Sequence, residues 1–196
     1  MQRNIKLRNQ IINYVRDFMN NEGFMELATP ILTAPSPEGA RDYLVPSRLH
    51  KGSFYALPQA PQQFKQLYMA SGVDKYFQIA PCFRDEDSRA DRSPGEFYQI
   101  DMEMSFATQE DVLDVISRLL FNTFDRFKLK DKLINKLPFP TFTYKDSVES
   151  FGCDKPDLRN PLRLANVTNY FEGSGLQIFE NLIQKGAIVN LSLIHI

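Results

Sequence analysis

Two strand-like segments, residues 76–80 and 96–106, flank the most densely charged stretch of the chain. Between them, residues 83–94 carry seven charged side chains in twelve positions. Consecutive strands joined by a polar connection favour a long antiparallel hairpin. An isolated hairpin is barely stable in water, so this one requires helices that cover its apolar face.

Helical periodicity on both sides of the hairpin predicts those covering helices. Apolar side chains recur every three or four positions from residue 5 to residue 19, and Gly23 follows; this is the pattern of an amphipathic helix. Residues 59–70 show similar spacing. Thr108 is a predicted N-cap of a helix that extends to about Phe127, because acidic residues follow it in the first turn.

The other segments are shorter or irregular. Residues 24–27 and 54–57 are typical of short strands, whereas residues 29–46 contain four prolines and Gly39. We therefore expect a shaped loop at 29–46 rather than regular structure. Together these elements predict an α+β fold, a mostly antiparallel sheet flanked by helices.

Several functional classes are disfavoured by composition and motifs. The chain has 23 Lys and Arg against 24 Asp and Glu, which does not favour a broad surface for nucleic acid or anionic lipid. It has neither GxGxxG nor GxxxxGK[ST], the fingerprints of two common nucleotide sites. Cys82 and Cys153 lack CxxC spacing, so we expect reduced thiols, no disulfide framework and no metal site.

No segment reaches the roughly 18 apolar residues of a membrane helix, and the start lacks the apolar core of a secretion signal. We therefore expect a cytoplasmic protein that does not bind a membrane.

The charged hairpin is also the main candidate for chemistry. Alternation along the strands groups Arg84 with Glu86, and Gln99 with Asp101 and Glu103. An arginine fork opposite carboxylates can bind a phosphate and a zwitterion together, and an aromatic such as Phe97 can stack on a base. The alternative is a solvated loop whose opposite charges pair with one another.

Four segments resemble one known family. The run FRDEDSRADRSPGEFYQIDMEMSF at residues 83–106 resembles the second signature motif of class II aminoacyl-tRNA synthetases, and in particular of bacterial-type aspartyl-tRNA synthetases. Residues 23–48, GFMELATPILTAPSPEGARDYLVPSR, resemble the first motif and the mobile loop that follows it. The segments YALPQAPQQFKQL at 55–67 and FGCDKPDLRNPL at 151–162 also resemble that family.

The resemblance implies a six-or-more-stranded antiparallel sheet and a two-step ligation. The carboxylate of L-aspartate would attack the α-phosphorus of ATP, giving aspartyl-adenylate and pyrophosphate, and tRNA would then accept the aspartyl group. The implied partners are L-aspartate, ATP and tRNA(Asp), with tRNA(Asn) left open, and the implied assembly is a homodimer. Mg²⁺ would be needed, with ligands outside this chain.

The resemblance also implies roles for individual residues. Arg84 would be catalytic, bridging the α-phosphate and the substrate carboxylate. ATP would be bound by Arg84, Asp85, Glu86 and Phe97. Aspartate would be bound by Arg84, by Lys65 at its side-chain carboxylate, and at its ammonium group by Glu38, Gln62 and Asp101. The tRNA acceptor end would be contacted by Arg89 and Arg92.

The family's third motif and its anticodon-binding barrel have no counterpart in the chain, so we expect a fragment with little or no activity alone. Residues 1–172 would be a partial class II catalytic domain, incomplete on its C-terminal side. Residues 173–190 would begin the bacterial insertion domain, with SGLQIF at 174–179 as its first strand. The final six residues, 191–196, are expected to be a non-native tail.

Two other functions stay open. One is a sister synthetase, either asparaginyl or asparagine-forming, although Lys65 and the DEDSRADR loop favour an aspartyl enzyme. The other is a non-catalytic dimerisation or tRNA-binding module. The presence of Arg84, Glu86 and Lys65 argues against that module.

Overall fold

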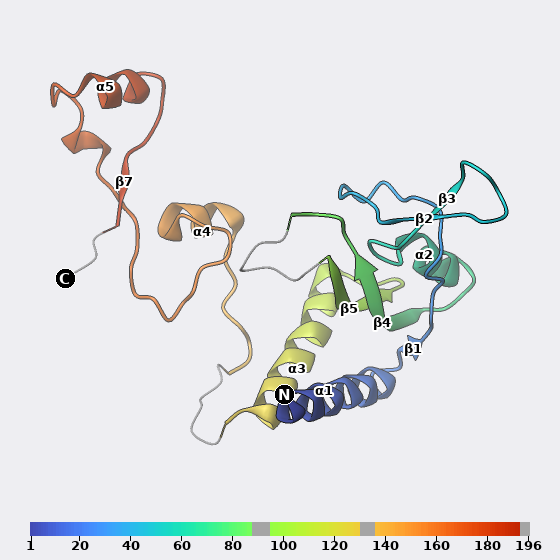
Figure 1. Cartoon of the computed structure of the whole chain (residues 1–196). Helices are drawn as coiled ribbons and strands as arrows, with labels where there is room; N and C mark the ends of the chain where they lie inside the picture. The colour runs from blue at the N-terminus through green and yellow to red at the C-terminus, as the bar shows by residue number, and fades with distance from the viewer. Residues whose placement is uncertain (88–94, 130–135, 193–196) are drawn as a thin grey trace. The chain divides into compact units, whose positions relative to one another are not determined.

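The computed structural model describes residues 1–87, 95–129 and 136–192. The chain divides into two compact units, Met1–Pro138 and Phe139–Ile196, and Figure 1 labels most of their helices and strands. The predicted hairpin and every predicted site residue belong to the first unit. The expected domain boundary at residue 172 falls inside the second unit and stays a prediction.

The first helix, α1 (Gln2–Asn21), forms where the apolar periodicity predicts it. Its stripe buries Val15 and Met19. The helix ends at Glu22, and Gly23 follows with a φ of +82°, a left-handed conformation that glycine adopts without strain. The chain then turns directly into the short strand β1 (Met25–Glu26).

The predicted hairpin is confirmed as the centre of the first unit. Strands β4 (Lys75–Phe83) and β5 (Glu96–Met104) pair antiparallel along their whole length, from Lys75 opposite Met104 to Phe83 opposite Glu96. β1 joins the other side of β4 in parallel, which gives the order β1-β4-β5. In the described residues this sheet has three strands, and the sheet of six or more strands that the resemblance implies stays a prediction.

The register of β4 and β5 separates two chemically different faces. Directly opposed residues of an antiparallel pair share a face. One face, which we call the polar face, carries the pairs Tyr76 with Glu103, Gln78 with Asp101, Ala80 with Gln99, and Cys82 with Phe97. The other face carries the pairs Phe77 with Met102 and Ile79 with Ile100.

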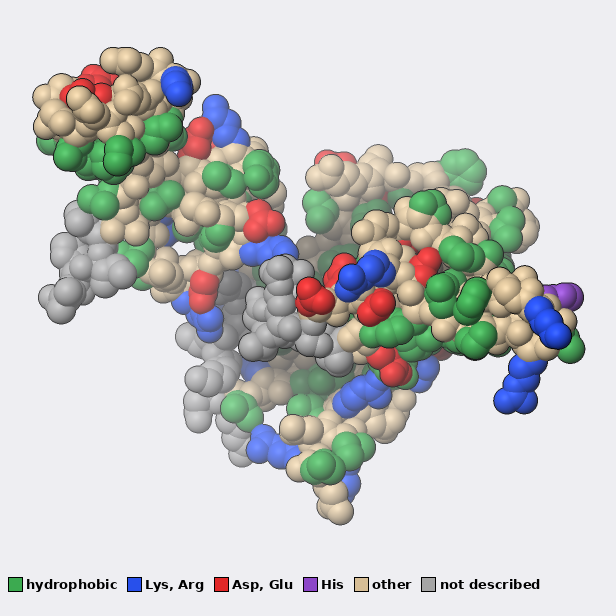
Figure 2. Space-filling model, turned by 45° about the horizontal axis from the view of Figure 1, so that its top comes forward, with side chains coloured by type: hydrophobic (Ala, Val, Ile, Leu, Met, Phe, Trp, Pro, Cys, Tyr) green, Lys and Arg blue, Asp and Glu red, His purple; other side chains and the backbone are tan. Residues whose placement is uncertain are grey.

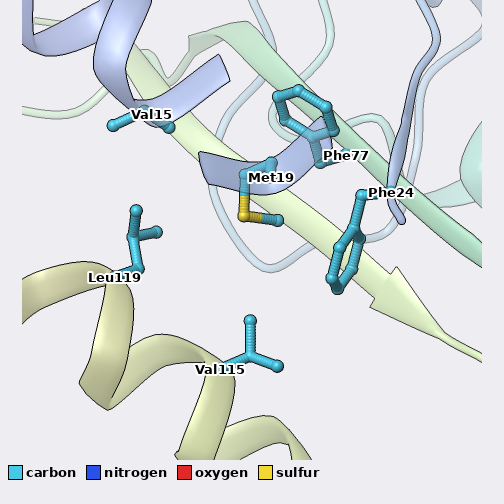
Figure 3. Close-up of a cluster of buried hydrophobic side chains, with 6 residues drawn as sticks. All are labelled: Val15, Met19, Phe24, Phe77, Val115 and Leu119. Carbon is cyan, nitrogen blue, oxygen red and sulfur yellow. The ribbon is translucent and has the colours of Figure 1, made fainter. Parts of the chain in front are cut away.

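The apolar face packs on two helices. α3 (Gln109–Phe127) begins at the predicted cap Thr108, which forms a capping box with Asp111. Figure 3 shows the core that α1, α3 and the sheet build together, composed of Val15, Met19, Phe24, Phe77, Val115 and Leu119. The buried stripe of α3 is narrow: Val115 and Leu119 are buried, whereas the apolar Val112 and Leu120 are exposed.

The polar face is bordered by a small hairpin and a helix. β2 (Leu44–Pro46) pairs antiparallel with β3 (Phe54–Ala56), so the expectation of a loop over all of 29–46 is wrong for its last three residues. α2 (Gln62–Ala70) packs on β4 and β5. It starts three residues later than its apolar spacing suggests, because Pro61 restricts the residue before it.

The second unit contains shorter elements. α4 (Tyr144–Phe151) is capped by Thr143 and ends at Gly152, and β6 (Ala165–Asn166) pairs with β7 (Asn190–Leu191). The other elements are the 3₁₀ turn η1 (Thr168–Tyr170) and α5 (Gln177–Ile183).

The strand expected at 174–179 is wrong, because the helix α5 begins at Gln177. The Gly175 N–H donates to the Glu180 carboxylate at 2.9 Å, and the Phe171 and Phe179 rings lie 4.7 Å apart. These contacts favour a helical turn. Leu191 lies in β7 and residues 193–196 lie outside the described residues, so the non-native origin of 191–196 stays a prediction.

Charge on the surface agrees with the balanced composition. On the face in Figure 2, acidic and basic side chains of the described residues are interspersed among apolar and neutral ones. Within the described part of the chain, no helix has both the length and the apolarity needed to cross a membrane.

We predict that Met19→Ala lowers the free energy of unfolding by about 2–5 kcal/mol, because it leaves a cavity between α1, α3 and the sheet. Met19 is fully buried, whereas Ile5 on the same helix is 62 % exposed. Ile5→Ala should therefore change the stability by less than about 0.5 kcal/mol. Urea unfolding followed by circular dichroism measures both values, and equal losses would contradict the assigned core.

Candidate active site

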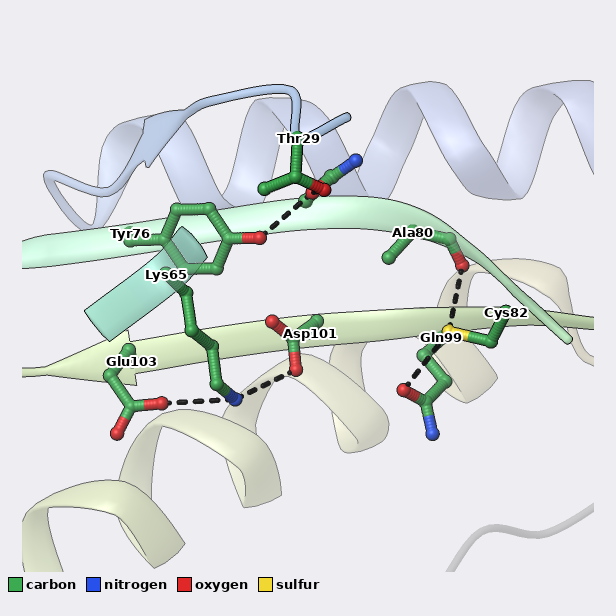
Figure 4. Close-up of polar contacts among 9 residues, drawn as sticks. Thr29, Lys65, Tyr76, Ala80, Cys82, Gln99, Asp101 and Glu103 are labelled. Atoms are coloured by element: carbon green, nitrogen blue, oxygen red, sulfur yellow. Dashed lines mark hydrogen bonds and ion pairs between the residues drawn. The ribbon is translucent and has the colours of Figure 1, made fainter. Parts of the chain in front are cut away.

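One buried lysine organises the polar face. α2 places Lys65 over β5, where its side chain is about 10 % exposed. Its Nζ lies 3.0 Å from Asp101 Oδ1 and 3.0 Å from Glu103 Oε2, as Figure 4 shows. Burial alone would lower the pKa of Lys65, but its hydrogen bonds to the two carboxylates outweigh burial and raise it. Lys65 therefore stays positively charged.

Asp101 retains an unused acceptor. Its Oδ2 atom is buried and has no hydrogen-bond partner among the described residues. A buried carboxylate oxygen without a donor is unfavourable by about 1–3 kcal/mol or more. With one ammonium and two carboxylates, the Lys65 cluster carries a formal charge of −1. The cluster is thus prepared to accept a further positively charged donor.

On the β4 side of this cluster, Tyr76 and Gln78 form a hydrogen-bonded group with Thr29. The Tyr76 hydroxyl donates to Gln78 Oε1 at 2.9 Å, and the Thr29 hydroxyl donates to the same oxygen at 3.0 Å. Burial, and after it the Asp101 charge, raises the pKa of Tyr76, so the phenol stays protonated. The Tyr68 ring from α2 stacks on Tyr76 at 6.0 Å. These contacts fix the side chains that surround Asp101.

Arg84 and Phe97 lie together at the other end of the polar face. The Arg84 guanidinium is 5.0 Å from the centre of the Phe97 ring, a cation–π contact. β4 ends at Phe83, so the strand alternation that grouped Arg84 with Glu86 does not apply beyond it, and this part of the prediction is wrong. From Phe97 to Asp101 the strand advances four residues, or about 13 Å.

Gly95 allows the chain to close tightly beside Arg84. The Arg84 N–H donates to the Gly95 carbonyl at 2.7 Å. A Cβ atom at position 95 would lie 2.7 Å from the Arg84 carbonyl oxygen and would collide with the Tyr43 hydroxyl. Because residue 95 has no side chain, the backbone of Arg84 can lie directly beside the residue that precedes β5.

Cys82 lies at the Phe97 end of the polar face, because the two residues are directly opposed. Its Sγ is fully buried and lies 3.3 Å from Gln99 Oε1 and 3.6 Å from the Ala80 carbonyl oxygen. Burial, and after it the negative charge of Asp101, raises the pKa of the thiol to about 11. A thiol in this state is a weak donor that packs against its neighbours, rather than a nucleophile.

Gln59 anchors the loop that carries Glu38, a contact that sequence patterns did not reveal. Gln59 is 1 % exposed. Its Nε2 donates to the Ala40 carbonyl at 2.9 Å and to Asp42 Oδ1 at 2.5 Å, and its Oε1 accepts from the Ala40 N–H at 3.2 Å. A buried glutamine that pairs with both the backbone N–H and the backbone carbonyl of one residue acts as a clamp. The only sequence indication is its place between Pro58 and Pro61, in a stiff segment.

The structure unites some predicted site residues and leaves others apart. Lys65 contacts Asp101, and Arg84 contacts Phe97. Within the described residues, the side chains of Glu38 and Gln62 make no hydrogen bond to these two pairs. Glu103, to which no role was assigned, is the second partner of Lys65.

The acidic residues after Arg84 lie outside the ladder. Asp85 and Glu86 are exposed. The Asp85 backbone is tied to Arg41, whose Nε donates to the Asp85 carbonyl at 2.8 Å. Arg89 and Arg92, the expected tRNA contacts, lie outside the described residues.

A metal site does not fit the residues that the structure describes. They contain no group of three or more His, Cys, Asp or Glu side chains that could hold an ion. Asp101 and Glu103 lie next to each other on the polar face, but both are bound to Lys65. We therefore assign no magnesium ligand in this part of the chain.

The comparisons with known proteins now identify the family. The family model described as tRNA synthetases class II (D, K and N) matches residues 1–179. The chain belongs to this family. A solved structure, described as a putative aspartyl-tRNA synthetase from Leishmania major Friedlin, is similar in fold to this class II synthetase chain, with a TM-score of 0.53 and 29 % identity over 62 % of this chain and 22 % of that one. The predicted fold class is confirmed.

Curated relatives agree with this assignment. This class II synthetase chain is 60 % identical to an aspartate–tRNA(Asp/Asn) ligase of Rickettsia bellii (strain OSU 85-389). The match covers 96 % of this chain and 31 % of the Rickettsia protein. The chain is 61 % identical to a ligase of the same name from Paramagnetospirillum magneticum, over 95 % of this chain and 21 % of that protein. The chain therefore spans about a third or less of the length of these relatives.

We predict that Gln59→Ala makes the loop around Ala40 more mobile, because the backbone N–H and carbonyl of Ala40 both lose their hydrogen bonds to the glutamine. Amide hydrogen exchange at Ala40 should accelerate at least tenfold, and the free energy of unfolding should fall by about 1–3 kcal/mol. The matched control is Gln63→Ala, at an exposed position four residues further on. Unchanged exchange at Ala40 would contradict the clamp.

We predict that the two cysteines differ sharply in reactivity. At pH 8 a thiol with a pKa of about 11 is ionised to roughly one part in a thousand, and Cys82 is also buried, whereas Cys153 is exposed. Iodoacetamide should alkylate Cys153 in the folded protein and both cysteines in urea, as measured by peptide mass spectrometry. Equal labelling rates in the folded protein would refute the burial of Cys82.

Proposed function

We propose that this chain carries the amino-acid and ATP sites of an aspartate–tRNA ligase, which joins L-aspartate to tRNA through an aspartyl-adenylate. The observation that carries the proposal is the arrangement of the polar face. A buried Lys65–Asp101 pair lies at one end and an Arg84–Phe97 pair at the other, about 13 Å apart along β5. Such a face can hold an amino acid and a nucleotide in line.

The amino-acid end of the polar face suits a substrate that carries both a positive ammonium group and a negative carboxylate. The unused Oδ2 of Asp101 would accept a hydrogen bond from the substrate ammonium, with Glu38 and Gln62 completing that contact. Lys65 is a permanent cation and would bind the side-chain carboxylate. A lysine at this position favours aspartate over its neutral amide, which argues against the asparagine-specific alternative.

The nucleotide end suits ATP. The Phe97 ring would stack on adenine, while Arg84 would bridge the α-phosphate and the attacking carboxylate, a role that fits a planar and always charged guanidinium. Asp85 and Glu86 would line the nucleotide. Neither step requires a nucleophile from the protein, because the rate gain comes from orienting the two substrates and from fixed charges around the phosphate.

The remaining partners rest on the relatives alone. The names of these relatives, aspartate–tRNA(Asp/Asn) ligases, support tRNA(Asp) and tRNA(Asn) as acceptors, with Arg89 and Arg92 as candidate contacts to the acceptor end. A homodimer built on α1 and residues 24–30, Mg²⁺ bound by residues other than those of this chain, and a cytoplasmic location complete the proposal. Because the chain spans about a third of its relatives, we propose that it has little or no ligase activity alone.

Binding of L-aspartate to this chain tests the proposal. Titrations followed by NMR should shift signals around Lys65 and Asp101, and L-asparagine should bind at least tenfold more weakly. Lys65→Met should weaken aspartate binding tenfold or more, because a charged hydrogen bond is worth about 1.5–3 kcal/mol. The matched control is Lys51→Met, at an exposed position. If aspartate and asparagine shift the same signals equally, the proposed substrate is wrong. A separate assay tests the proposed inactivity: ATP–pyrophosphate exchange by this chain at a normal rate would refute it.

A further inference from the structure

The two carboxylates that bind Lys65 are held very differently. Both lie 3.0 Å from its Nζ, yet the Asp101 side chain is 11 % exposed and the Glu103 side chain is 39 % exposed. A buried carboxylate that loses its cation cannot be rehydrated, whereas a partly exposed one can turn into water. Breaking the ion pair between Glu103 and Lys65 therefore costs much less free energy than breaking the pair between Asp101 and Lys65.

A third carboxylate cannot simply be added to this cluster. Lys65 has three N–H donors, of which two are directed to Asp101 and Glu103. A further carboxylate on the third donor would place three negative charges around the Lys65 ammonium, where like charges repel strongly. The substrate's own ammonium group would offset the charge of Asp101 but not that of Glu103. A carboxylate ligand thus binds more favourably to Lys65 when Glu103 moves away.

We infer that Glu103 is an internal competitor of the substrate: in the empty site it occupies the position on Lys65 that the side-chain carboxylate of the amino acid takes, and it swings into solvent when that ligand binds. This inference rests on the proposed function, because it concerns the same amino-acid site. Glu103 keeps Lys65 charged and correctly placed while the site is empty. It also lowers the affinity for aspartate, since binding must break the ion pair between Lys65 and Glu103.

Two substitutions at Glu103 separate this role from others. Glu103→Gln removes the charge, and Glu103→Asp keeps the charge but shortens the side chain by one methylene, so that it no longer reaches Lys65. Both variants should bind L-aspartate about two- to fivefold more tightly, the range expected for loss of a partly exposed ion pair. ATP binding, at the other end of the face, should not change. The matched control is Glu96→Gln, an exposed position at the start of β5 on the other face, which should leave aspartate affinity unchanged.

Calorimetric titration of the four proteins with L-aspartate, and with ATP separately, gives these values. In the unmodified protein, the ¹³C signal of the Glu103 carboxyl should also move to its solvent-exposed position when aspartate is added, which tests the displacement without any substitution. Tighter binding by both Glu103 variants together with this shift supports the inference.

Three results would overturn it. Weaker or equal aspartate binding by Glu103→Gln would show that Glu103 assists the ligand or does not act on it. Tighter binding by Glu103→Gln but not by Glu103→Asp would show a general effect of charge. A Glu103 carboxyl signal that stays in place would exclude displacement. In all three cases binding of aspartate by the unmodified protein leaves the proposed function intact, whereas its failure to bind aspartate contradicts the proposed function, and the inference with it.

Discussion

The register between β4 and β5 is the constraint on which the other features of the first unit depend. Nine consecutive pairs join the strands, and the apolar face packs Phe77 into the core with α1 and α3. A slip of one residue would turn Met102 toward the polar face and Asp101 toward the core. The hydrophobic packing of one face therefore decides which side chains can do chemistry on the other.

The buried charge of Asp101 links the groups of the polar face. It holds Lys65 protonated against the effect of burial, and it adds to burial in raising the pKa values of Tyr76 and Cys82. These groups therefore have fixed protonation states at neutral pH: a cation, a neutral phenol and a neutral thiol. A preorganised pattern of donors and acceptors of this kind is what orientation of a charged ligand requires.

The sequence predicted features that follow from local patterns. Periodicity located α1 and α3, and alternation put Gln99, Asp101 and Glu103 on one face, because these patterns depend on the geometry of a single element. It could not predict contacts between distant segments, such as the Gln59 clamp on the loop at Ala40. The alternation was wrong beyond Phe83, where the strand ends before Arg84. The strand that the resemblance implied at 174–179 was wrong because the helix α5 begins at Gln177.

In the proposed function, a single strand positions both substrates. Phe97 and Asp101 belong to β5, so the distance between the nucleotide end and the amino-acid end is set by four residues of extended backbone. A strand that is paired and packed on one face cannot change this spacing without breaking its ladder. Because a misplacement of about 1 Å can reduce a rate a hundredfold, a rigid strand is a better support for these two ends than two separate loops.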